Sequence, residues 1–257
     1  MFVVAAAAVL LIGSCDSTIE EEHPKTEITV LFAYSETLAD SVDDVGALIS
    51  DGLRATNEAY RTSNVPIRNV QAGLIPVSYT AEDRLEILAQ LLDPADGVLD
   101  EVHVRRDEVE ADVVVLVSDR RGQTINASVL ATPATAFVIV WWESLGDPYY
   151  GLAHELAHLQ GARHETVRDP ASEPFPYGHG FRSDAYRTIM SGGPATLVPR
   201  FSGPDQVFEG VVLGDSATAD VARVLRETAT YVSNFRGPTT PDAFVPPGTW
   251  PTLGDGS

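Results

Sequence analysis

The strongest constraint on this chain is a segment in which histidine, glutamate and glycine recur at fixed spacing, HELAHLQGARH at residues 154–164. Residues four apart on a helix lie one turn apart on the same face, so His154 and His158 can direct their imidazoles at one ion. Glu155 points beside them, where it can take a proton from a metal-bound water rather than bind the ion. The segment therefore predicts a helix that holds zinc and activates water.

The same segment supplies a third ligand after the helix. Glycine readily adopts the left-handed conformation that helix ends often require, so we expect the helix to stop at Gly161 and the chain to turn back with His164. Three histidines leave a fourth position open for water, which is typical of a catalytic zinc site rather than a closed structural one. The alternative, three histidines on an ordinary core helix, fits this spacing poorly.

Composition argues against a nucleic-acid partner. The chain has 37 acidic and 17 basic residues, a formal net charge of −20 at pH 7, and such a field repels nucleic acid. Its 257 residues are 44% hydrophobic, enough for a proper core. We expect a globular monomer.

The N-terminus reads as an export signal. Residues 2–12 form an apolar run of signal-peptide length, too short to span a membrane. They lead into IGSC, which resembles a bacterial lipobox whose cysteine, Cys15, receives lipid. An ordinary signal peptide cleaved near Ser14 is the alternative and would give a secreted protein. No Lys or Arg precedes the run, which leaves a start codon further upstream open.

Hydrophobic periodicity predicts several strands and helices along the chain. The expected strands span residues 28–34, 65–79, 112–118 and 136–142. The expected helices run from a cap at Ser35 or Thr37 to about residue 60, and over 82–92, 99–110 and 217–234. Residues 123–130 fit either an edge strand able to pair with an extended peptide or a plain connecting loop. His103, in a charged helix, is expected at the surface rather than on a metal.

The zinc segment resembles the metzincin metalloendopeptidases, whose signature HExxHxxGxxH is followed by a methionine-containing turn beneath the metal. Met190, in RTIM at residues 187–190, is similar to that methionine, although core packing is the ordinary role of a methionine. The resemblance implies an α/β (α+β) fold. Its parts are a twisted mixed five-stranded sheet, a long helix behind it, the active-site helix below, and a smaller C-terminal subdomain across a cleft.

A closer resemblance is to the bacterial peptidyl-Asp metalloendopeptidases. It rests on the zinc segment, on YGHGF at 177–181, on RTIM, and on ARVLRETA at 222–229 through NFR at 234–236. It implies a zinc-dependent endopeptidase that cuts proteins on the amino side of aspartate, with Glu155 as general base. Selecting aspartate requires a cation. Arg182, Arg187 and Arg200 lie in the stretch expected to line that pocket, though each also fits an ordinary surface or structural arginine.

Three departures from that family stand out. Gly192 lies two residues after Met190, where some metzincins carry a tyrosine that supports the transition state, so zinc alone or another donor must do so here. The single cysteine excludes the internal disulfides of secreted relatives. The segment between Cys15 and Ile28 is too short for an inhibitory propeptide, so any latency must arise otherwise.

These observations predict a signal peptide at 1–14, an acidic tether at 15–27, a catalytic domain at 28–237 and a Pro-rich tail at 238–257. His179 is expected to fix its glycine-flanked loop, with a hydrogen bond near the metal as the alternative. Glu165 could anchor the His164 loop. A calcium ion is open but unsupported. The expected location is the bacterial cell envelope.

Two other functions stay open. One is a zinc-binding adhesion or recognition lipoprotein that keeps the fold but does not cleave, against which an intact Glu155 argues. The other is a zinc hydrolase of a non-peptide substrate, which the helix alone does not exclude.

Overall fold

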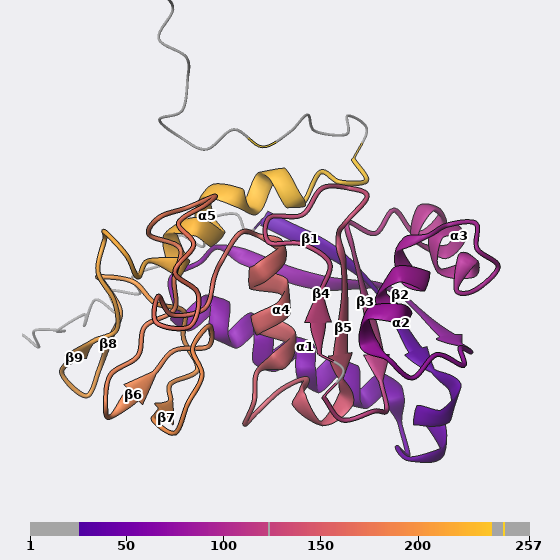
Figure 1. Cartoon of the computed structure of the whole chain (residues 1–257), viewed down its shortest axis with the longest axis horizontal. Helices are drawn as coiled ribbons and strands as arrows, with labels where there is room; N and C mark the ends of the chain where they lie inside the picture. The colour runs from indigo at the N-terminus through magenta and orange to yellow at the C-terminus, as the bar shows by residue number, and fades with distance from the viewer. Residues whose placement is uncertain (1–25, 123, 238–243, 245–257) are drawn as a thin grey trace, which may run out of the picture.

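The computed structural model of the chain describes residues 26–122, 124–237 and 244 (Figure 1). The expected signal peptide, the lipobox with Cys15, the tether up to residue 25 and all of the tail except Phe244 lie outside the described residues. Thr26 and Glu27, assigned to the tether, instead begin the first strand.

A five-stranded mixed sheet forms the centre of the fold, as expected. Its order is β2-β1-β3-β5-β4, with β4 antiparallel to β5 and the other neighbours parallel. The strands are β1 (Thr26–Ser35), β2 (Ile67–Val77), β3 (Val113–Ser118), β4 (Ile125–Asn126) and β5 (Phe137–Trp141). Residues 123–130, which fitted either an edge strand or a loop, thus contain the edge strand β4, which is only two residues long.

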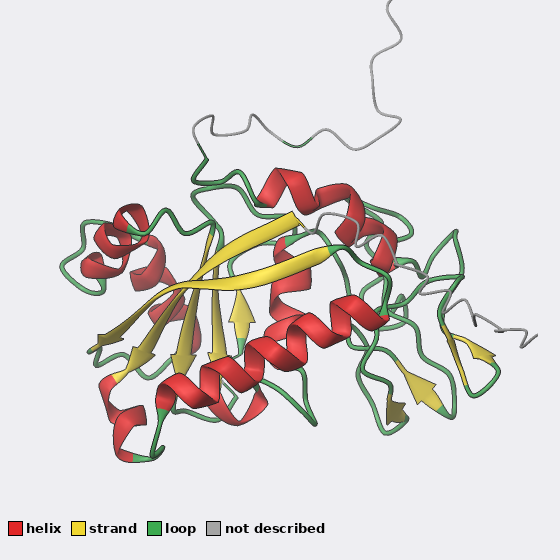
Figure 2. Cartoon of the chain, turned by 180° about the vertical axis from the view of Figure 1, so that it is seen from behind, coloured by secondary structure: helices red, strands yellow, loops and turns green. Residues whose placement is uncertain are grey.

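Both faces of the sheet are covered, which explains why β3 and β5 are almost continuously apolar. Alternate residues of each strand point to opposite sides: Val115 and Val138 join the core on the side of α1 (Val45–Thr62), whereas Leu116 and Phe137 face α2 (Arg84–Leu92) and α3 (Asp100–Glu108). Figure 2 shows α1 lying along its face of the sheet.

The first helix begins later than its sequence predicts. After β1 the chain forms a 3₁₀ helix at Glu36–Asp40, and α1 starts only at Val45. Neither Ser35 nor Thr37 is the cap of α1. The carboxylate of Asp44 accepts a hydrogen bond from the backbone N–H of Ala47 at 2.9 Å, which satisfies a donor in the first turn. Leu38 remains buried although it lies outside α1.

Two irregular residues of β2 are tolerated because β2 is an edge strand. Pro76 lacks a backbone N–H but pairs with Tyr34 at the sheet's margin, where a missing donor is acceptable. The β1–β2 register shifts beside Gly73, where an added Cβ would lie 3.0 Å from a methyl of Leu31. These features account for the interruptions visible in the sequence.

His103 is less exposed than expected. It is half-buried, its Nε2 lies 3.0 Å from the carbonyl oxygen of Leu91 at the end of α2, and its ring centroid is 5.1 Å from that of Phe137. Its role in the structure is to join α3 to α2 and the sheet, so it is a packing residue rather than a solvated one.

The chain after α4 (Gly151–Leu159) forms a second, less regular part. It contains two small sheets, one of β6 (Tyr186–Arg187) with β7 (Thr196–Leu197) and one of β8 (Val207–Phe208) with β9 (Val211–Val212). In Figure 1, α4 stands between this part and the five-stranded sheet. The last helix, α5 (Val221–Val232), returns its apolar residues to the core beside α1.

α5 is shorter than expected because its first turn is set by a side chain. The Asp220 carboxylate accepts a hydrogen bond from the N–H of Arg223 at 3.1 Å, so the helix starts at Val221 rather than near Ala217. Among the described residues, none of the helices has both the length and the apolar character needed to cross a membrane.

Candidate metal centre

α4 lies in the interior of the molecule and carries the first two histidines of the motif. All of its residues are buried except His154, which is half-buried. Gln160, just past its end, donates a hydrogen bond to the Tyr60 hydroxyl of α1 at 2.8 Å. A helix covered on nearly all sides is held in one orientation, which fixes where His154 and His158 point.

Gly161 ends α4 and returns the chain, as its position in the motif predicts. Its φ of +100° lies in the left-handed region that disfavours side chains, and an added Cβ would lie only 2.6 Å from the Phe175 ring. The N–H of Gly161 bonds the carbonyl of His158 at 2.9 Å. The tight turn brings His164 back beside the helix.

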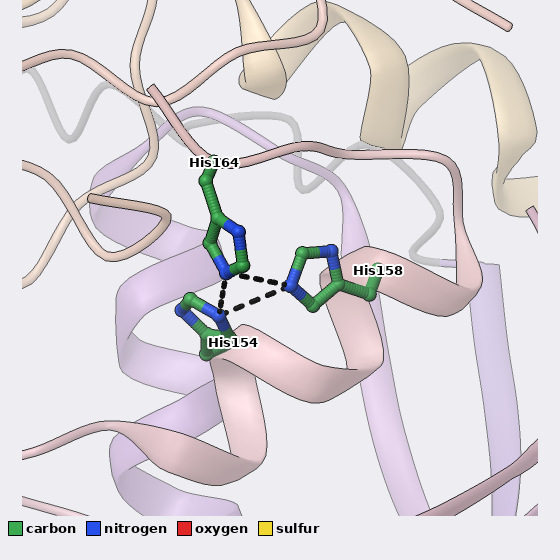
Figure 3. Close-up of side chains that lie close together, drawn as sticks. All are labelled: His154, His158 and His164. Carbon is green, nitrogen blue, oxygen red and sulfur yellow. Dashed lines mark hydrogen bonds between the residues drawn. The ribbon is translucent and has the colours of Figure 1, made fainter. Parts of the chain in front are cut away.

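The three histidines converge on one point (Figure 3). Their Nε2 atoms lie 3.1 Å apart for His154 and His164, 3.1 Å for His154 and His158, and 3.2 Å for His158 and His164. The ligands of a tetrahedral zinc ion with Zn–N bonds of about 2.0–2.1 Å are about 3.3 Å apart. The spacing therefore fits a zinc ion bound at the centre.

Backbone carbonyls decide which nitrogen of two of these rings faces the centre. Nδ1 of His154 lies 2.8 Å from the carbonyl oxygen of Ile189, and Nδ1 of His158 lies 2.8 Å from that of Ala162. A carbonyl oxygen only accepts, so each Nδ1 carries the proton and each Nε2 presents a lone pair. Lone pairs directed at one point repel each other unless a cation lies between them.

Burial keeps the imidazoles neutral, which is the form that binds metal. It lowers the pKa of His154 and of His164 to about 4, and that of His158 well below its usual value. Neighbouring positive charge lowers them further: His164 and Arg168 act on the pKa of His154, and Arg168 acts on that of His164.

Glu155 lies next to this cluster and is itself buried, with 5% of its surface exposed. Burial raises the pKa of its carboxyl to about 8, while the positive charge of Arg168 acts in the opposite direction. A carboxyl group in this setting exchanges protons near neutral pH. It can therefore serve as a proton acceptor next to a bound cation.

Met190 lies in a turn next to the histidine cluster. Met190 is fully buried, and the preceding carbonyl, that of Ile189, is the one that orients His154. Gly180 approaches so closely that an added Cβ would lie 2.7 Å from the Met190 carbonyl carbon. Met190 thus lies in a turn that contacts both the YGHGF segment and the first histidine.

His179 and Glu165 hold the loop that carries His164. Nδ1 of His179, a buried residue, donates to the carbonyl oxygen of His164 at 2.8 Å. The buried carboxylate of Glu165 accepts from the N–H of Gly192 at 3.2 Å and from Arg182 at 3.4 Å. His179 therefore fixes its loop, and Glu165 anchors the His164 loop to the segment after Met190.

The arginines singled out in the sequence bond mainly to backbone. Arg182 donates to the carbonyl of Gly192 at 3.3 Å as well as to Glu165, and Arg187 donates to those of Ser191 at 2.7 Å and Ala195 at 3.2 Å. Arg200 donates to Val207 in β8 at 2.8 Å. All three are engaged in holding loops together.

Sequence reasoning missed Arg168, the cation whose charge acts on Glu155, His154 and His164. It lies four residues after the last histidine, in a loop with no periodic pattern. The one available signal was its place directly after the motif, which says nothing of where its side chain lies.

Residues 25–199 match the model of Metallo-peptidase family M12. The chain belongs to this family. Membership agrees with the three-histidine cluster, implies a zinc cofactor and confirms the metallopeptidase resemblance of the sequence.

Similar proteins include the peptidyl-Asp metalloendopeptidase of Stenotrophomonas maltophilia strain R551-3. It is 32% identical over 223 residues, which are 83% of this chain and 53% of that protein. The peptidyl-Asp metalloendopeptidase of Xanthomonas campestris pv. campestris is 33% identical over 219 residues, 83% of this chain and 52% of that protein. The chain thus spans about half the length of these curated relatives.

A solved structure supports the fold alone. A chain in a structure titled "Structure of a chaperone-substrate complex" superposes with a TM-score of 0.69 at 18% sequence identity, covering 83% of this chain and 35% of that chain. The fold of this chain is therefore shared with that chain at low sequence identity.

Proposed function

We propose that this chain is a zinc-dependent endopeptidase in which His154, His158 and His164 hold the metal. The observation that carries the proposal is the convergence of three Nε2 atoms, 3.1–3.2 Å apart, next to a buried carboxyl group. Zinc bound there supplies Lewis acidity, which polarises a peptide carbonyl and makes water a better nucleophile.

Glu155 is the proton carrier in this proposal. Its carboxylate takes a proton from the attacking water and delivers it to the amine that leaves when the peptide bond breaks. Burial raises the pKa of Glu155 to about 8 in the metal-free protein, and a cation among the three histidines favours the ionised form needed for a base.

We further propose that the bond cut lies on the amino side of an aspartate. Support comes from the peptidyl-Asp metalloendopeptidases to which the chain is 32% and 33% identical. An extended substrate has a backbone partner available in β4, the antiparallel edge strand of the sheet, which could add one more strand by main-chain hydrogen bonds.

Cleavage of an unfolded protein substrate tests the enzymatic proposal. We expect the purified protein to degrade it, a chelator to stop the reaction, and added zinc to restore it. Peptide products should begin with aspartate. A protein that binds zinc but cleaves neither the unfolded protein nor peptides would instead favour the non-cleaving recognition module, and cleavage before random residues would refute the aspartate preference.

We also propose that the protein is exported, is held at the cell envelope by lipid on Cys15, and acts as a monomer without nucleic acid. The support is the apolar run at 2–12, the following IGSC and the net charge of −20. Mass spectrometry of the protein from membranes should find a lipid-modified Cys15, and Cys15→Ala should release the protein. An unmodified chain cut near Ser14 would favour secretion.

A further inference from the structure

Arg168 lies on a turn that is held at both ends. The backbone N–H groups of Arg168 and Asp169 donate to the carbonyl of Glu165 at 2.9 and 3.0 Å. The Glu165 side chain accepts from the N–H of Gly192, and the Asp169 carboxylate pairs with Arg163 at 2.9 Å. The backbone of Arg168 is therefore fixed, although its side chain is exposed.

The guanidinium of Arg168 reaches the segment that follows Met190, and its charge acts on Glu155. Its Nη1 would lie 3.2 Å from a Cβ added to Gly192, two residues after Met190. The φ of Gly192 is not in the left-handed region, so the backbone there would accept a side chain. Because Gly192 has no side chain, the Arg168 guanidinium can lie close to its backbone.

Arg168 differs from the other arginines near the centre because its guanidinium has no bonded partner among the described residues. Within residues 26–122 and 124–237, its guanidinium makes no hydrogen bond and no ion pair. By contrast, Arg163 pairs with Asp169, Arg182 with Glu165, and Arg187 with two backbone carbonyls. A partly solvated cation next to a catalytic centre is available to an incoming anion.

An acidic substrate needs such a cation more here than in most proteins. The chain carries a net charge of −20, which repels a carboxylate on approach. The loops around Arg168 lack that acidic excess: between residues 163 and 187 four arginines are matched by four acids, Glu165, Asp169, Glu173 and Asp184.

We propose that Arg168 is the residue that selects substrates with an acidic side chain next to the cleaved bond, by binding that carboxylate. The inference rests on the endopeptidase activity proposed above and assigns its specificity to a residue outside the zinc motif. The arginine acts on the substrate side chain and not on the reacting carbonyl.

The test compares two peptides, blocked at both ends and identical except for Asp or Asn after the cleaved bond. We expect Arg168→Gln to lower kcat/KM for the Asp peptide about 10- to 100-fold more than for the Asn peptide, the range of one charge-assisted hydrogen-bonded pair. Any loss shared by both peptides reports the missing charge near Glu155. Arg168→Glu should favour a Lys peptide. Arg182→Gln, which removes a paired arginine, should keep the Asp preference.

Gly192→Ala provides a second test that leaves Arg168 in the sequence. An added methyl group would meet only the end of the Arg168 side chain, which can move. We expect a reduced preference for Asp over Asn at unchanged thermal stability. An unaltered preference in both Arg168→Gln and Gly192→Ala would overturn the proposal, and so would an equal loss with both peptides.

A binding measurement tests the role of Arg168 independently of the proposed endopeptidase activity. In the zinc-loaded Glu155→Gln variant, fluorescence anisotropy should show tighter binding of the Asp peptide than of the Asn peptide, and Arg168→Gln should remove the difference. Wild-type protein that cleaves nothing would refute the endopeptidase activity while the binding result still decides Arg168. An Arg168 effect seen only with an unblocked C-terminus would overturn the proposal in favour of recognition of the terminal carboxylate.

Discussion

At the scale of single residues, the centre depends on groups that would not touch a substrate. The carbonyls of Ile189 and Ala162 assign the proton to Nδ1 of His154 and of His158, and His179 holds the backbone of His164. Outer partners of this kind set the orientation of metal ligands and their basicity. The chemistry proposed for Glu155 relies on this fixed arrangement.

Glu155→Gln should abolish cleavage and leave the metal centre intact. An amide has nearly the same shape as the carboxyl group but accepts no proton, so we expect kcat/KM to fall by about 10²- to 10⁴-fold. Zinc content, measured by mass spectrometry of the metal, should stay at one ion per chain. Glu101→Gln, at an exposed site on α3, is the matched control. Activity within tenfold of wild type would remove Glu155 from the mechanism.

At the scale of elements, the turn that ends α4 decides where the third histidine lies. The helix is covered by packing, but the position of His164 depends on the turn at Gly161, where φ is +100° and the Phe175 ring leaves no space for a Cβ. A change at this turn moves the third histidine without altering any ligand.

Gly161→Ala should therefore weaken zinc binding as well as the fold. We expect a loss of about 2–4 kcal/mol in the free energy of unfolding, from backbone strain together with the contact to Phe175. Gly97→Ala is the control, because Gly97 has a similar φ of +85° but open space around it. It should cost about 1 kcal/mol and leave zinc affinity unchanged. Urea unfolding and a zinc titration measure both quantities, and equal effects of the two variants would contradict this account.

The sequence predicted elements well where the signal is local and periodic. The zinc helix, the buried strands β3 and β5, and the end of α4 at Gly161 all follow from spacing within a few residues. The start of α1 did not, because Ser35, Thr37 and Asp44 are all good capping residues and only tertiary packing selects Asp44. Arg168 was missed because its proximity to Glu155 is set by how loops fold in space.

At the scale of the whole molecule, the buried titratable groups make stability depend on pH in two opposing ways. The pKa of His154 and of His164 falls from 6.5 to about 4, so acid destabilises the metal-free protein as the unfolded chain takes up protons the folded chain refuses. The pKa of Glu155 rises from 4.5 to about 8, so its contribution to stability is present below pH 4.5 and is lost as the pH rises through 8.

Below pH 6.5 the histidines change the free energy of unfolding more than the single glutamate does. Above pH 6.5 the unfolded histidines are neutral as well, so only Glu155 still changes it. We therefore expect the contribution of this centre to the stability of the metal-free protein to peak near pH 6.5. In urea unfolding with a chelator, wild type should lose stability relative to Glu155→Gln between pH 6.5 and pH 8. A difference between the two proteins that stays constant over that interval would show that Glu155 ionises freely in the folded state.

The histidine cluster also spans two unequal parts of the molecule. The part after α4 has only two-residue strands, and it meets the helix partly through His164 and through the bond from His154 to Ile189. A bound ion therefore joins the part with few regular elements to the part built on the five-stranded sheet. Zinc supply would then govern how long the protein survives as well as how fast it works: a chain without metal presents its loops to other proteases, and starvation for zinc would remove the protein itself.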